Sequence, residues 1–206
     1  MQLIYHIYPR RGWALDLNLV YLAQYFDLFD EILVGVAEDS TTYTAAQIKH
    51  CFPQRTFFYN YKNTRDGEAN TFKHFLPTLK ANDYSFYAHC KGVTHNSSIG
   101  LITWIKHLYE KNLSQVPDLK SFGTIGILRK HEKKRGVFCK YKWCFSGTFF
   151  WLNNNKLMAK PDWQYIQPRC RYAVEYYPGN QFELKESQCL FWDRPNCDLG
   201  NINRWK

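Results

Sequence analysis

His89 and Lys91 are the residues of this chain whose types and spacing most clearly indicate chemistry. They follow an alternating, aromatic run that begins at Tyr84 and breaks at Gly92, so a buried strand is predicted to end there. Residues two apart in an extended strand share a face, which points His89 and Lys91 the same way and turns Cys90 toward the core. Open α/β sheets bind ligands at the carboxyl ends of their strands, and an imidazole beside an ammonium favours an anionic ligand there.

Side chains at three other predicted strand ends are expected to reach the same crevice. Tyr8 and Asp39 end the first two predicted strands, and Arg65 and Asp66 lie in the loop after the third. Because the carboxyl ends of parallel strands meet along one edge of a sheet, we expect these groups near His89. A guanidinium can hold a pyrophosphate and a carboxylate can hold a sugar hydroxyl, and these are the roles that we expect for Arg65 and Asp66.

Three further positions have both a functional and a structural interpretation. Glu68 opens a predicted helix, where capping of free backbone amides is at least as good an explanation as function. Ser146 and Gly147 would let the backbone approach a ligand closely, or simply form a turn. Glu175 could act as a general base on an acceptor hydroxyl, or form a surface ion pair with Arg171 four residues earlier.

Two segments raise the question of acceptor and membrane contacts. His95 and Trp104 could line an acceptor groove, because sugar rings stack on indoles, although a helical tryptophan is more often part of the core. The basic segment 129–135, RKHEKKR, is predicted to be an exposed loop, and peripheral contact with a membrane or a lipid-linked acceptor is the alternative.

The predicted elements alternate between strand and helix, which is typical of an α/β fold with a mainly parallel sheet flanked by helices. Strands are predicted over residues 3–8, 31–39, 55–61, 84–89, 123–128 and 144–153, the last entered through a turn of small residues. Helices are predicted over residues 17–29, 44–52, 69–80, 99–112 and 169–177, with Pro178 and Gly179 ending the last one. The first half of the chain therefore resembles a nucleotide-binding sheet.

The composition indicates one globular domain over residues 1–206, with a nucleotide-binding half at about 1–95 and an acceptor-side half at about 96–206. No long apolar run or secretory signal is visible, so we expect a cytoplasmic protein. Seven cysteines without a paired CxxC spacing favour reduced thiols over a disulfide framework or a zinc site. The net charge of +9 favours anionic partners. Walker, GxGxxG, HExxH and GxSxG motifs are all missing, which removes the simplest routes to kinase, dehydrogenase, zinc protease or serine hydrolase chemistry.

Taken in order, the motifs NTRDGE, YAHCKGVTH, the tryptophan in the next helix, CFSGTFFWLN and RCRYAVEYYPG resemble a family of small GT-A glycosyltransferase domains. Such domains occur in polysaccharide gene clusters and large algal viruses, and the resemblance spans residues 63–179. It implies a three-layer GT-A fold and transfer of a hexose or deoxyhexose from a nucleotide-diphosphate sugar, with UDP favoured, to a hydroxyl of a glycan acceptor. Cys144 and Thr148 depart from the family pattern, which often has histidine and asparagine there.

The resemblance also implies site residues. His89 and Lys91 stand where many such enzymes have the DxD metal motif, Ser146 and Gly147 match a ligand-contacting turn, and Glu175 matches a helix glutamate. The expected donor-binding set is Tyr8, Asp39, Arg65, Asp66, His89, Lys91, Ser146 and Gly147; the acceptor-side set is His95, Trp104 and Arg171; and the catalytic base is Glu175, with Asp66 second.

Whether a metal ion takes part is open at this point. Either His89, Asp39, Asp66 and the diphosphate hold a weakly bound Mn²⁺ or Mg²⁺, which we slightly favour, or Lys91 and Arg65 neutralise the diphosphate directly. One imidazole is a poor anchor for a hard cation.

Two alternatives to a glycosyltransferase remain. The positive charge and the 18% aromatic content are compatible with a nucleic-acid-binding module, although the basic residues are dispersed and most aromatic residues fit core positions, so we expect no nucleic-acid partner. The missing DxD carboxylates are compatible with a catalytically inactive carbohydrate-binding relative. The oligomeric state is not indicated by the sequence.

Overall fold

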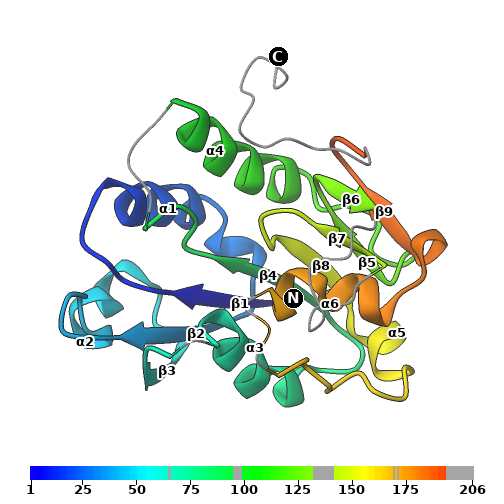
Figure 1. Cartoon of the computed structure of the whole chain (residues 1–206), viewed down its shortest axis with the longest axis horizontal. Helices are drawn as coiled ribbons and strands as arrows, with labels where there is room; N and C mark the ends of the chain where they lie inside the picture. Colours follow the sequence, from blue (N-terminus) through cyan, green and yellow to red (C-terminus); the bar gives the residue numbers. More distant parts are fainter. Residues whose placement is uncertain (65, 95–98, 132–141, 169, 171, 194–206) are drawn as a thin grey trace.

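The computed structural model describes residues 1–64, 66–94, 99–131, 142–168, 170 and 172–193. Within these ranges the chain forms an α/β fold around a mixed seven-stranded sheet of order β3-β2-β1-β4-β8-β5-β9, with a separate two-stranded sheet of β6 and β7 (Figure 1). The predicted fold class, a mostly parallel sheet with a Rossmann-like first half, is confirmed.

The strands are β1 (Gln2–Ile7), β2 (Glu31–Glu38), β3 (Thr56–Lys62), β4 (Tyr84–His89), β5 (Thr124–Gly126), β6 (Arg129–His131), β7 (Trp143–Phe145), β8 (Phe150–Asn153) and β9 (Ser187–Cys189). The α-helices are α1 (Trp13–Ala23), α2 (Ala45–Ile48), α3 (Glu68–Phe75), α4 (Ile99–Leu113), α5 (Asn154–Met158) and α6 (Ala173–Gln181). Short 3₁₀ helices lie at Phe26–Leu28, Lys49–Cys51, Leu76–Thr78 and Leu184–Glu186.

The strand order changes direction between β1 and β4. The chain adds β2 and β3 on one side of β1 and then places β4 on the other, and all four strands run parallel. In this register His6 is the partner of His89. A reversal of strand order leaves a crevice at the carboxyl ends of the two central strands, which is where open α/β sheets bind ligands.

Alternation along the strands separates two cores, one on each face of the sheet. Tyr5, Phe86 and Ala88 pack with α1 and α4 on one face. Ile4 and Tyr87 pack with α3 and α6 on the other. Successive side chains of a strand alternate between faces, so His6 and His89 belong to the face covered by α3 and α6 (Figure 1).

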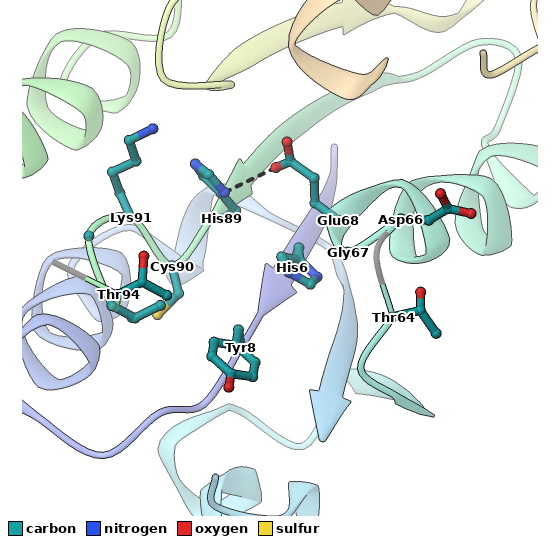
Figure 2. Close-up of a pocket in the computed structure, with 12 residues that line it drawn as sticks. His6, Tyr8, Thr64, Asp66, Gly67, Glu68, His89, Cys90, Lys91 and Thr94 are labelled. Atoms are coloured by element: carbon teal, nitrogen blue, oxygen red, sulfur yellow. Dashed lines mark ion pairs between the residues drawn. The ribbon is translucent and has the colours of Figure 1, made fainter. Parts of the chain in front are cut away.

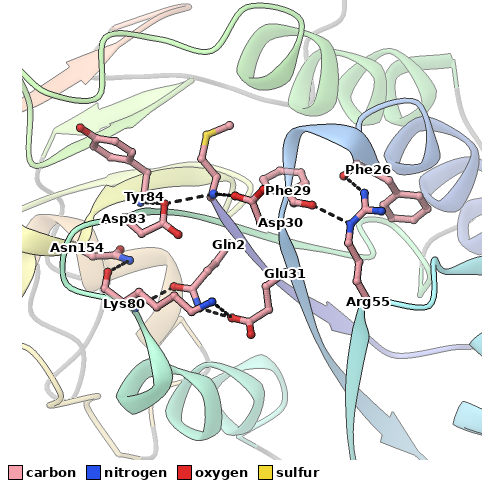
Figure 3. A network of polar contacts seen from close by, with 11 residues as sticks. Gln2, Phe26, Phe29, Asp30, Glu31, Arg55, Lys80, Asp83, Tyr84 and Asn154 are labelled. Carbon is pink, nitrogen blue, oxygen red and sulfur yellow. Dashed lines mark hydrogen bonds and ion pairs between the residues drawn. The ribbon is translucent and has the colours of Figure 1, made fainter.

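Polar side chains fix the opposite edge of the sheet, where the strands begin (Figure 3). The fully buried amide of Gln2 donates to Glu31 Oε2 at 2.6 Å and accepts from the Lys80 backbone N–H at 3.0 Å. Asn154 Nδ2 donates to the carbonyl of Lys80 at 2.9 Å, and Arg55 donates through Nε to the carbonyl of Phe29. Buried polar groups are costly unless they are paired in this way, so these bonds fix where β1, β2 and β3 start.

Three predicted boundaries are wrong in informative ways. Segment 144–153 is not one strand: its first residues belong to β7 and its last to β8. Residues Arg129–His131 are not loop but strand β6, paired with β7, while residues 132–135 lie outside the described ranges. Helix α6 continues through Pro178 and Gly179. Gly179 is required there, because a Cβ would lie 1.8 Å from the backbone oxygen of Trp143 and hold the helix off β7.

The expectation that the cysteines are reduced thiols is confirmed in part. Cys51, Cys90, Cys144 and Cys189 are free thiols, as expected, whereas Cys170 is disulfide-bonded, which corrects the expectation for that residue. In the described part of the chain, no helix has the length and apolar character needed to cross a bilayer.

Candidate functional site

A cavity of about 270 Å³ opens where β1 and β4 end (Figure 2). His6 and Tyr8 line it from the end of β1 and just beyond, Asp66 and Glu68 from the turn that opens α3, and His89 and Lys91 from the tip of β4. The predicted convergence of strand ends on one crevice is thus observed for Tyr8, Asp66, His89 and Lys91. The sequence analysis did not identify His6 as a site residue and left capping and function both open for Glu68.

His89 is held at both ring nitrogens. Nε2 lies 3.0 Å from the carbonyl oxygen of Gly147, which can only accept, so Nε2 carries a hydrogen. Nδ1 lies 3.0 Å from Oε2 of Glu68, and both side chains are mostly buried, at 16% and 14% exposure (Figure 2). Burial alone would raise the pKa of Glu68, but the charge and hydrogen bond of His89, with help from His6 and Lys91, bring it below its usual value. A carboxylate can only accept, so with Glu68 ionised the hydrogen between the two side chains lies on Nδ1.

We expect Glu68→Gln to lower the free energy of unfolding by about 2 kcal/mol at pH 6, because the amide keeps a hydrogen-bond acceptor but loses the charge. The folded-state pKa of Glu68 is depressed, so its contribution is complete above the ordinary carboxyl pKa and disappears as pH falls through the folded-state value. The difference between wild type and variant should shrink between pH 6 and pH 3 in urea titrations. Glu110→Gln, at an exposed pair with Lys106, is the matched control with a small effect throughout. A difference independent of pH would contradict the ion pair.

Lys91 is positioned from two directions. Its ammonium lies 4.2 Å from the ring centroid of Trp104 on α4. Its backbone is paired with fully buried Asn18 on α1, which accepts from the Lys91 N–H at 3.1 Å and donates to its carbonyl at 2.8 Å. The side-chain amide of Asn18 thus makes the two backbone hydrogen bonds that a neighbouring strand would make just beyond the end of β4.

Glu175 joins the same group of charges from α6. Burial raises the pKa of Glu175; the positive charge of Lys91 opposes the rise, and the negative charge of Glu68 adds to it. The Cys144 thiol lies 3.8 Å from Oε1 of Glu175. The charges of Lys91, Glu68 and His89 therefore act on the Glu175 carboxyl of α6, although the cavity wall described above contains Asp66 and not Glu175.

Gly147 contacts His89, and neither Ser146 nor Gly147 lines this cavity. Ser146 is 1% exposed, and its hydroxyl has no hydrogen-bond partner among the described residues. Gly147 has φ +99°, and a Cβ there would lie 2.8 Å from Leu108, so the turn is filled by α4. Thr148 has φ +61°, a left-handed conformation that costs energy for a β-branched residue. At this turn the Gly147 carbonyl accepts a hydrogen bond from His89, and the close approach of a ligand stays a prediction.

Asp39 lies beside the cavity at a second, open hollow of about 440 Å³ that Glu38, Asn60 and Lys62 also line. Its carboxylate accepts from the Thr41 hydroxyl and N–H and from the Tyr8 hydroxyl at 2.7 Å. Hydrogen bonds from Thr41, then from Tyr8, lower the pKa of Asp39 to about 2. Tyr8 therefore lies between the two hollows.

The other predicted site residues differ in what the structure says of them. Arg65, His95 and Arg171 lie outside the described residues. The ring of Trp104 lies against the ammonium of Lys91.

The residues predicted to bind a metal do not fit one in this arrangement. Both nitrogens of His89 are engaged, and the Asp39 carboxylate accepts hydrogen bonds from Tyr8 and Thr41 at a different hollow. Among the residues that the structure describes, no three His, Cys, Asp or Glu side chains group as metal ligands. The arrangement gives no support to a Mn²⁺ or Mg²⁺ site at His89 and Asp39.

Comparison with known proteins gives little further guidance. No protein-family model matches this chain, and neither does any curated protein sequence. Among solved structures, a 4-diphosphocytidyl-2C-methyl-D-erythritol synthase from Anaerococcus prevotii is similar over 98% of this chain and 93% of its own, with 10% identity and a TM-score of 0.47. The 2-C-methyl-D-erythritol 4-phosphate cytidylyltransferase of Francisella tularensis is similar over 100% and 99%, with 16% identity and a TM-score of 0.40. Likenesses this distant carry no functional argument.

Proposed function

We propose that this protein is a glycosyltransferase that moves a hexose or deoxyhexose from a nucleotide-diphosphate sugar, with UDP favoured, to a hydroxyl of a glycan acceptor. The observation that carries the proposal is the cavity where the strand order reverses, which is lined by Lys91 and by the Glu68 and His89 ion pair, with the carboxyl of Glu175 under the influence of their charges. A diphosphate leaving group develops negative charge, and a fixed ammonium in a partly buried site stabilises such charge well.

The proposal assigns the charge neutralisation to Lys91 and Arg65 and not to a metal ion. In this proposal His89 organises the site and does not contact the diphosphate, because both of its nitrogens are occupied by Glu68 and Gly147.

Glu175 is the proposed base that takes the proton of the acceptor hydroxyl, with Asp66 as the second candidate. A raised pKa brings a carboxyl closer to the working pH, which suits a group that must accept a proton and release it again. Asp66 lies directly on the cavity wall, where it can also hold a sugar hydroxyl.

The decisive experiment is a donor-hydrolysis and transfer screen with UDP, GDP and dTDP sugars, in the presence and absence of EDTA. We expect turnover of one donor class, unchanged by EDTA, and a loss of about 100-fold or more in Glu175→Gln. Glu183→Gln, at an exposed ion pair with Lys142, is the matched control. Comparing the turnover of Asp66→Asn with that of Glu175→Gln shows which of the two carboxylates acts as the base.

Other outcomes would replace the proposal. No binding or turnover with any nucleotide sugar would refute it. Salt-sensitive binding to single-stranded nucleic acid, unaffected by UDP, would favour the nucleic-acid-binding alternative. Glycan binding without nucleotide dependence would indicate an inactive carbohydrate-binding relative. Turnover abolished by EDTA and restored by Mn²⁺ would refute the assignment of charge neutralisation to Lys91 and Arg65.

A further inference from the structure

His6 is a buried histidine on the cavity wall that the proposed chemistry does not use. It is 7% exposed and lies opposite His89 in the register of β1 and β4. Its Nδ1 contacts the Thr71 hydroxyl at 3.0 Å and the Tyr61 hydroxyl at 3.1 Å. Its Nε2 has no hydrogen-bond partner in the described part of the chain, and it is not one of the fully enclosed unpaired atoms, so it borders open space.

The hydrogens of this cluster can be counted. The Tyr61 hydroxyl donates to the carbonyl of Gly67 at 2.9 Å, which uses its only hydrogen. The contact of 3.0 Å between Tyr61 and Thr71 then requires the Thr71 hydroxyl to donate. Neither hydroxyl has a hydrogen left for His6, so Nδ1 carries the hydrogen and shares it between the oxygens of Thr71 and Tyr61.

The remaining nitrogen is therefore an acceptor when the ring is neutral. Burial lowers the pKa of His6 to about 4; the negative charge of Glu68 opposes the shift and the charge of His89 adds to it. At neutral pH the ring has no second hydrogen, and the lone pair of Nε2 faces the cavity. His89 has the opposite arrangement, since its Nε2 donates to Gly147.

The rest of the wall suits a ligand rich in hydroxyl groups. Thr64 and Thr94 contribute hydroxyls, Asp66 a carboxylate and Tyr8 a phenol, around a volume of about 270 Å³. A neutral acceptor at Nε2 complements the O–H of a sugar, and it offers nothing to a phosphate oxygen, which needs a donor.

We propose that His6 is a specificity residue whose Nε2 accepts a hydrogen bond from one hydroxyl group of the bound nucleotide sugar. The inference rests on the proposed function and deepens it. The hydroxyl belongs either to the ribose or to the transferred sugar, and the two sources share the same chemistry at Nε2. A site built around a hydroxyl discriminates against the analogue that lacks it, because the acceptor is then left buried and unpaired.

The test measures binding of UDP, 2′-deoxy-UDP, a UDP-hexose and its deoxyhexose analogues to wild type and His6→Phe by calorimetry. We expect wild type to bind one deoxy analogue about 10- to 100-fold more weakly than its parent, and His6→Phe to lose that difference. The analogue concerned identifies the source, ribose or transferred sugar. Thr71→Val, which removes a ring anchor and leaves Nε2 in place, should keep most of the difference. Equal discrimination in wild type and His6→Phe would overturn the inference.

A second measurement separates this inference from the proposed function. In ¹⁵N-histidine NMR of the ligand-free protein, the resonances missing from His6→Phe identify His6, and we expect a protonated Nδ1 and an unprotonated Nε2 between pH 6 and 8. A protonated Nε2 would overturn the inference even if nucleotide sugars bind. If the expected tautomer is found but no nucleotide sugar binds, the proposed function is overturned, and with it the role of His6 as a specificity residue.

Discussion

Lys91→Ala is expected to lower turnover of the nucleotide sugar by about 100- to 1,000-fold while leaving the fold intact. Removing one preorganised group that stabilises developing negative charge costs about 3 to 4 kcal/mol of transition-state energy in other enzymes. The loss should fall mainly on kcat, because the charge of the diphosphate grows as the glycosidic bond breaks. The measurement is steady-state kinetics of donor hydrolysis and transfer.

The control for Lys91→Ala is Lys106→Ala, which removes an exposed ammonium from α4 that is 3.8 Å from Glu110. Lys106→Ala changes the net charge by the same amount as Lys91→Ala, and we expect it to alter turnover by less than about twofold. Lys91→Arg should retain part of the activity, since it keeps the charge but changes the geometry of the donor. Activity of Lys91→Ala within about threefold of wild type would remove Lys91 from the mechanism.

Asn18→Ala is expected to lower the free energy of unfolding by about 3 to 5 kcal/mol. Asn18 is fully buried and uses all of its hydrogen-bonding capacity: it bonds the N–H and C=O of Lys91, the carbonyl of Ala14 and the hydroxyl of Tyr109. The alanine variant leaves several of these groups buried and unpaired, at about 1 to 3 kcal/mol each. Urea unfolding measures the loss.

Asn112→Ala is the matched control for Asn18→Ala. Asn112 is also fully buried on a helix, but its amide bonds only the carbonyl of Leu108 and its Oδ1 has no partner among the described residues. We expect a loss of about 1 kcal/mol there. Hydrogen exchange at the Lys91 amide should accelerate in Asn18→Ala and not in Asn112→Ala. Equal protection of this amide in both variants would show that Asn18 does not position the strand tip.

The sequence predicted most of the first half of the sheet because its patterns are local. Alternation of aromatic and small residues placed the fourth strand at the residues where it lies, Tyr84–His89. The second half was less predictable. Segment 144–153 divides between two sheets because Gly147 and Thr148 adopt positive φ values, and α6 passes through Pro178 because Gly179 fits against β7.

The candidate site shows the same division. Tyr8, Asp66, His89 and Lys91 were placed together correctly, because strand ends of a parallel sheet share one edge. For Glu68 the sequence left helix capping and function both open, and it placed His6 only within a strand. The sequence did contain a signal for each: His6 is a polar residue in an otherwise apolar first strand, and Glu68 is an acidic residue at the start of a later helix.

The sequence by itself determined the order of the elements, the positive charge and the arrival of an imidazole and an ammonium at the end of a central strand. The tertiary structure alone decided what these groups contact: Glu68 and Gly147 bind the two nitrogens of His89, and Asn18 bonds the backbone of Lys91. The physical reason is that strand periodicity is a property of neighbouring residues, whereas protonation and hydrogen-bond partners depend on burial and on groups that only folding brings together.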